Sequence, residues 1–156
     1  MKYLRLILLL FFIQSCSDEV VEYNKSLIST RFGEFTISSL EESNQKQIIS
    51  FEKKPLYTPD LPGDIELYGL YSLDDEDVLV LISNQTEDIK FLIMSINLEH
   101  SIIITNTFGS GYDKPDIIRE SSYLEINFPA REGYKSQTVL YKNRKIDIRD
   151  IHFSKK

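Results

Sequence analysis

The stretch VLVLISNQTEDIKFLIMSI, residues 78–96, contains two apolar runs separated by a short polar segment. Residues 78–82 and 91–96 are rich in the β-branched and large apolar side chains that favour strands. The segment between them, residues 84–88, carries polar residues typical of turns. A link this short joins antiparallel neighbours, because a parallel pair needs a crossover of about a dozen residues or more. The stretch therefore predicts an antiparallel pair of strands.

Seven further runs of the same kind flank this pair and also lie between turn signals. They occupy residues 35–37, 48–51, 65–71, 102–105, 123–128, 138–141 and 146–151. Short polar links, such as residues 142–145, join several of them, so antiparallel pairing is expected throughout. The sequence predicts an all-β chain, mainly an antiparallel meander, folded as a small barrel or as a two-sheet sandwich. No internal repeat of about 20 to 50 residues is evident.

The segment SSLEESNQKQIISF, residues 38–51, fits two local structures. Ser39 and Glu42 match a helix-start capping box, which predicts a short helix near residues 39–50. The same residues also fit a hairpin with its turn at residues 42–45. Only three of the four residues on the expected helical face are apolar, which favours the hairpin.

The first residues of the chain are typical of a targeting segment. Lys2 and Arg5 give a positive start, and residues 6–13 are an unbroken apolar run. That run is too short for a membrane-spanning helix, which takes about 20 apolar residues. The residues that follow, Ile13-Gln14-Ser15-Cys16, resemble the lipobox of bacterial lipoproteins. The resemblance implies cleavage before Cys16 and acylation of this cysteine, which then anchors the protein in a membrane.

This resemblance divides the chain into three parts. Residues 1–15 are expected to be a lipoprotein signal peptide, residues 16–31 the acylated cysteine and a tether, and residues 32–156 a single β-rich domain. More than one acyl chain makes such an anchor stable, since a single chain gives only marginal attachment. The acidic run at residues 17–19 looks like the export signal of surface lipoproteins in some Gram-negative lineages; the alternative is an ordinary solvated tether. The expected location is the bacterial cell envelope, with the anchor in the outer membrane.

Charge limits the classes of partner. Without Lys2 and Arg5, 16 basic residues oppose 24 acidic ones, a net charge of −8. A negative protein repels nucleic acid, which we exclude as a partner. From Arg131 onward, however, eight basic residues oppose three acidic ones. This basic end is expected to be a solvated edge strand, in which lysines discourage association with other strands.

The acidic run at residues 74–77 is the best candidate for a metal site. Asp74, Asp75 and Asp77 supply the hard oxygen ligands that calcium prefers. The run lacks the alternating spacing and the glycine of an EF-hand loop, so the candidate is a weak one. The alternative is a charged turn between two strands.

Phe108, Tyr112 and Asp113 form the candidate ligand loop, because two aromatic side chains flank a Gly-x-Gly hinge there. The alternative is that Phe108 packs at the end of its strand and the glycines provide turn conformations. No catalytic residue is assigned: Glu99, His100 and Ser101 are consecutive, and adjacent residues of an extended chain point to alternate faces. No cofactor is expected either.

Two classes of function remain. The first is a binding or interaction module, held in the membrane through Cys16, for an envelope or extracellular protein or glycan. The second is an extracytoplasmic hydrolase that uses carboxylates, with a protective or inhibitor lipoprotein as a third alternative. The sequence contains no evident pair of nucleophile and base, which favours the binding module over an enzyme.

Overall fold

The computed structural model describes residues 23–39, 47–61, 63–84, 89–109, 114–130 and 135–151. These residues form twelve strands in three antiparallel sheets of four. No helix in this part of the chain is long and apolar enough to cross a membrane.

Each sheet is a meander in which consecutive strands pair. The first sheet contains β1 (Tyr23–Thr30), β2 (Gly33–Ser39), β3 (Gln47–Phe51) and β4 (Lys54–Tyr57). The middle sheet contains β5 (Asp64–Ser72), β6 (Glu76–Asn84), β7 (Lys90–Asn97) and β8 (Ile102–Ile104). The last sheet contains β9 (Asp116–Arg119), β10 (Tyr123–Phe128), β11 (Ser136–Lys142) and β12 (Lys145–Ile151).

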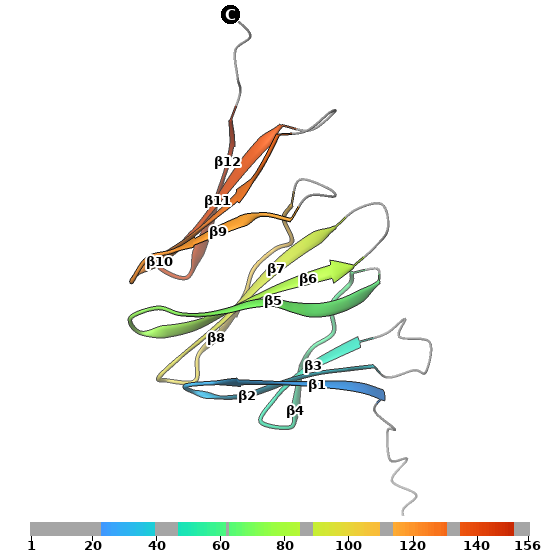
Figure 1. Cartoon of the computed structure of the whole chain (residues 1–156). Coiled ribbons are helices and arrows are strands. Elements are labelled where there is room, and N and C mark those ends of the chain that lie inside the picture. Colours follow the sequence, from blue (N-terminus) through green and yellow to red (C-terminus); the bar gives the residue numbers. More distant parts are fainter. Residues whose placement is uncertain are drawn as a thin grey trace, which may run out of the picture.

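The three sheets stack face to face, and the middle sheet is buried on both sides (Figure 1). Along β6, Val78 and Val80 pack toward the last sheet, whereas Leu79 and Leu81 pack toward the first sheet. Successive side chains of a strand point to opposite faces, so an unbroken apolar run is what two cores require. The run at residues 78–82 therefore determines a three-layer stack.

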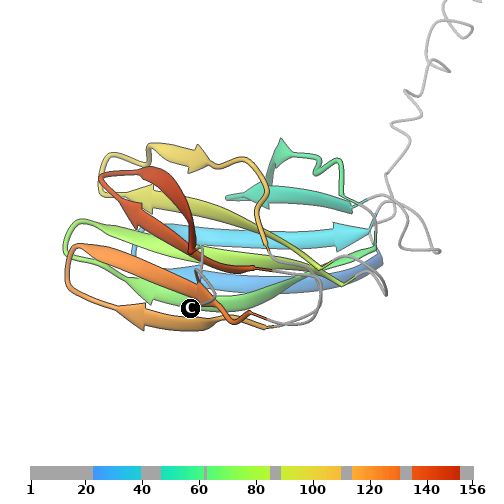
Figure 2. The ribbon, with the colours of Figure 1, turned by 90° about the horizontal axis from the view of Figure 1, so that it is seen from above.

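The strands of all three sheets follow one another in the same direction across the stack (Figure 2). Their first strands, β1, β5 and β9, lie along one side, and their fourth strands, β4, β8 and β12, lie along the other. The described structure thus consists of three similar four-stranded meanders, although the sequence shows no repeat.

The prediction of an all-β, antiparallel fold is confirmed. None of the three sheets closes into a barrel, and the stack is consistent with a sandwich that has a third layer. The preference for a hairpin near residues 39–50 is also supported, because Ser39 pairs with Gln47 across β2 and β3. Residues 40–46 lie outside the described part of the chain. Within the segment expected as a tether, residues 16–31, the structure has β1 at Tyr23–Thr30.

Candidate functional site at the six-turn end

Six short turns lie together at one end of the stack, toward the left in Figure 1. They join the first strand to the second and the third to the fourth in every sheet. Their residues are 31–32, 52–53, 73–75, 98–101, 120–122 and 143–144. We call this surface the six-turn end. β1 begins at Tyr23, at the opposite end of the stack from these turns (Figure 1).

Two of these turns are two-residue hairpin links of the type that matches the twist of antiparallel strands. Glu52 and Lys53 both have positive φ, and so do Asn143 and Arg144. Two successive residues with positive φ are the signature of the type I′ turn. The turn predicted at residues 142–145 is therefore confirmed, and β12 is the predicted edge strand.

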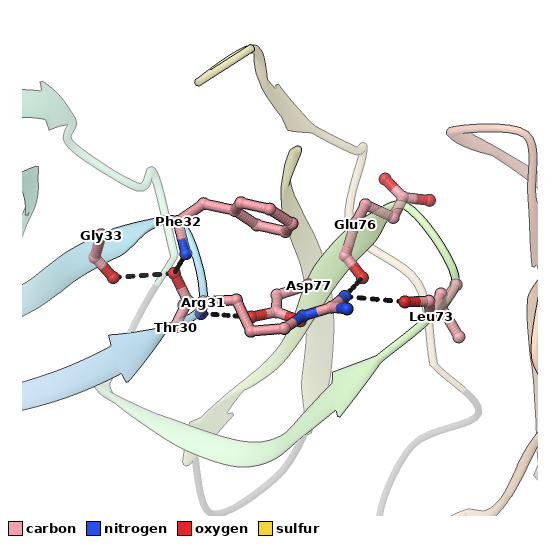
Figure 3. Close-up of polar contacts among 7 residues, drawn as sticks. All are labelled: Thr30, Arg31, Phe32, Gly33, Leu73, Glu76 and Asp77. Atoms are coloured by element: carbon pink, nitrogen blue, oxygen red, sulfur yellow. Dashed lines mark hydrogen bonds and ion pairs between the residues drawn. The ribbon is translucent and has the colours of Figure 1, made fainter. Parts of the chain in front are cut away.

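Arg31 joins the first sheet to the middle sheet (Figure 3). Its Nε donates to Asp77 Oδ1 at 2.7 Å, and its backbone N–H donates to Asp77 Oδ2 at 2.6 Å. Its Nη2 donates to the carbonyl oxygens of Leu73 at 2.7 Å and Glu76 at 2.8 Å. The Asp77 side chain is only 1% exposed, so Arg31 neutralises a buried carboxylate.

Glu76, the neighbour of Asp77, joins the middle sheet to the last sheet. The Tyr141 hydroxyl donates to Glu76 Oε2 at 2.9 Å, and Arg144 Nε lies 3.5 Å from the same oxygen. Arg144 Nη2 also donates to the Ser101 carbonyl oxygen at 2.6 Å. Burial raises the pKa of Tyr141, and the charge of Glu76 raises it further. Consecutive residues of β6 thus pair with opposite neighbours, because their side chains leave the strand on opposite faces.

Two further contacts fix the remaining turns. The Asp74 N–H donates to the Ser121 carbonyl oxygen at 2.8 Å, which links the β5–β6 turn to the β9–β10 turn. The centroids of the His100 and Phe51 rings lie 6.2 Å apart, next to the β3–β4 turn. Five of the six turns therefore contact a turn or a strand end of a neighbouring sheet, and the sixth, residues 52–53, directly follows Phe51. Leu98, in the β7–β8 turn, is 78% exposed, the largest exposed fraction among the large apolar side chains described.

The predicted calcium ligands do not lie in equivalent environments. Asp77 is buried and bound to Arg31, whereas Asp74 and Asp75 are exposed. Within the described ranges, no group of three or more histidine, cysteine or carboxylate side chains is placed to hold a metal. Glu99, His100 and Ser101 belong to the β7–β8 turn, where the Asn97 side-chain oxygen accepts from the N–H groups of Glu99 and Ser101.

The candidate ligand loop is described only in part. Phe108 is 5% exposed and packs in the core against Phe91 and Phe128, with which its ring makes aromatic contacts. Gly109 has φ of 141°, and a Cβ there would lie 3.0 Å from the Ile89 carbonyl oxygen. Phe108 thus packs in the core, and Gly109 has a backbone conformation that favours glycine. Both agree with the alternative interpretation, in which this segment serves packing and turn geometry. Tyr112, Asp113 and Cys16 lie outside the described residues.

The sequence alone did not identify the residues that hold the six-turn end together. Arg31, Tyr141 and Arg144 were not singled out, and Glu76 was grouped with a surface turn. One signal for Glu76 and Asp77 was available, since both directly precede the apolar run at residues 78–82 and can belong to its strand.

The chain matches no protein-family model, no curated protein and no solved structure. The six-turn end is therefore interpreted from its own contacts and from the sequence.

Proposed function

We propose that this protein is a lipoprotein of the bacterial cell envelope, anchored through Cys16, that binds a protein partner through its six-turn end. The proposal rests on the observation that the start of β1 and the six turns lie at opposite ends of the stack. β1, the first strand after the lipobox-like motif in the sequence, begins at one end of the stack, and the six turns lie at the other end.

The expected anchor lies close to the folded domain. Cys16 precedes the first residue of β1 by seven positions, which span at most about 25 Å when fully extended. β1 then runs away from the anchor toward Thr30 and the first turn. A domain held by its end in this way presents the six-turn end to the space away from the membrane.

The six-turn end has the properties of a preorganised protein-binding surface. Hydrogen bonds from Arg31 and Arg144 fix the turns, so binding there would order few additional groups. The exposed Leu98, in a turn that hydrogen bonds from Asn97 hold, can act as an aliphatic anchor for a partner pocket. Asp74, Asp75 and Glu99, in turns of the same end, are exposed and would form the polar rim.

Site-specific photo-crosslinking on intact cells tests the binding surface. A photoreactive residue replaces Leu98 in one variant and Leu27 in a control; Leu27 is 60% exposed on the outer face of the first sheet. We expect a discrete protein adduct from position 98 that is absent from position 27. Leu98→Asp in the full chain, without a photoreactive residue, should abolish co-purification of the same protein. Identical adducts from both positions, or an adduct that contains glycan alone, would contradict a protein site at the six-turn end.

The anchor is tested separately by metabolic labelling with a palmitate analogue. Cys16→Ser is expected to lose the label and to accumulate in an uncleaved or mislocalised form. Unchanged labelling of this variant would refute acylation at Cys16.

A further inference from the structure

β12 differs from the other edge strands of the described structure. β4, β8 and β9 contain only three or four residues. β1 and β5 are longer, but each has a register shift in its ladder, at Tyr23/Ser26 and at Leu67/Gly69. β12 has seven residues, and its ladder with β11 runs without interruption from Ser136↔Ile151 to Lys142↔Lys145. Short and bulged edges resist the addition of a further strand, whereas a long, regular edge accepts one.

The side chains of β12 are divided between its two faces. Ile148 lies opposite the buried Val139 and so points to the core side of the last sheet, yet it is 44% exposed. Asp147 and Arg149 point to the outer side, where they form an ion pair of 2.7 Å with both side chains more than half exposed. Among the described residues, β12 thus offers a backbone edge that no strand pairs with, an incompletely covered isoleucine, and one charge of each sign.

We propose that β12 pairs with β12 of a second copy of this chain, antiparallel and centred on Ile148. In this register Ile148 lies opposite its own copy, and Asp147 of each chain lies opposite Arg149 of the other. The two-fold axis generates two such ion pairs, as an isologous interface requires. Opposite charges directly across an antiparallel pair stabilise it, and like charges destabilise it.

Neighbouring two-fold registers are disfavoured by the same charges. Moving the centre to residue 147 places two Asp147 side chains opposite one another, and it also sets Lys145 against Arg149. Moving the centre to residue 149 places two Arg149 side chains opposite one another. The charges on this edge therefore favour the register centred on Ile148 over the two adjacent registers.

The register rests only on the backbone edge and the charges of β12, so the pairing does not depend on the proposed function.

Charge exchange in the full-length protein tests the pairing. Two differently tagged copies are co-expressed and the fraction that co-purifies is measured for wild type, Asp147→Arg, Arg149→Asp and the exchanged double variant. Each single variant carries two like charges per strand, so self-capture should fall at least about tenfold. Asp147→Arg mixed with Arg149→Asp should recover capture, because each Arg then meets an Asp of the other chain. The double variant should also recover it.

Two results would overturn the proposal. One is the absence of co-purification in the wild type under conditions in which Cys16 is labelled, which separates this failure from failure of the anchor. The other is a loss of capture in both single variants that neither mixing nor the double exchange restores. Glu34→Lys, an exposed charge change on the first sheet, serves as the control that should leave capture unchanged.

Discussion

Removal of the Arg31 side chain is expected to destabilise the domain far more than removal of an arginine from an exposed ion pair. Arg31→Ala deletes one charge-assisted bond to Asp77 and two bonds to carbonyl oxygens. It leaves the Asp77 carboxylate buried with the backbone N–H of residue 31 as its remaining partner from this turn. Breaking a fully buried ion pair costs about 3 to 5 kcal/mol. Because Arg31 is itself 43% exposed, solvent screens part of the interaction, and we expect a loss of about 2 to 3 kcal/mol.

Arg149→Ala is the matched control. It removes an arginine that contacts a carboxylate at the same 2.7 Å distance, but the two side chains are 66% and 58% exposed. An exposed pair contributes about 0 to 1 kcal/mol. For a domain of this size, the difference corresponds to a melting temperature about 5 to 10 °C lower for Arg31→Ala than for Arg149→Ala.

Urea unfolding of both variants at low protein concentration measures the two free energies. A double-mutant cycle with Asp77→Ala isolates the coupling between Arg31 and Asp77, which should exceed about 1 kcal/mol. Equal losses of stability for Arg31→Ala and Arg149→Ala, or a coupling near zero, would refute the role assigned to Arg31.

Three further outcomes are expected. Stability should fall as the pH rises above about 10, because the pKa of Tyr141 is raised in the folded protein and the unfolded chain releases its proton first; the fall, measured from melting temperatures, should be shallower in Tyr141→Phe. Gly109→Ala should lower the melting temperature, since its φ of 141° and the carbonyl oxygen 3.0 Å from the new Cβ both oppose a side chain. Millimolar calcium should raise the melting temperature no more than magnesium does, because Arg31 holds Asp77; a calcium-selective rise that disappears in Asp74→Asn/Asp75→Asn would instead establish a metal site.

The strands that the sequence predicted share one physical property: each has at least one apolar face. Eight of the nine predicted runs lie entirely within strands of the structure, and the ninth, residues 102–105, extends one residue beyond β8. The three strands that were not predicted, β1, β4 and β9, are all edges of their sheets. β4 and β9 are exposed at most positions, so they carry little of the apolar pattern by which strands are recognised. Edge strands are therefore the hardest part of such a fold to predict from one sequence.

The third layer was not predicted because periodicity was used to find strands but not to count buried faces. β10 alternates between buried and half-buried side chains, as a strand with one core face does. β7 has six consecutive buried residues, which a two-layer sandwich does not require. The same residues that indicate a strand thus also indicate its place in the middle of the stack. The repeated unit stays invisible in the sequence because the middle sheet needs two apolar faces and each outer sheet needs one.

The same logic explains why the acidic run was interpreted as a surface turn. Residues 74–77 are all acidic, so the sequence does not distinguish exposed from buried positions among them. β6, however, begins within this run at Glu76. From that residue on, alternation sends Glu76 to one core and Asp77 to the other, and each needs a cation from a different sheet. Arg31 and Arg144 provide these cations from turns that are over one hundred positions apart in the chain, a separation that no local pattern reports. The carboxylates of Glu76 and Asp77 therefore connect both outer sheets to the middle sheet, at the end of the stack where the six turns lie.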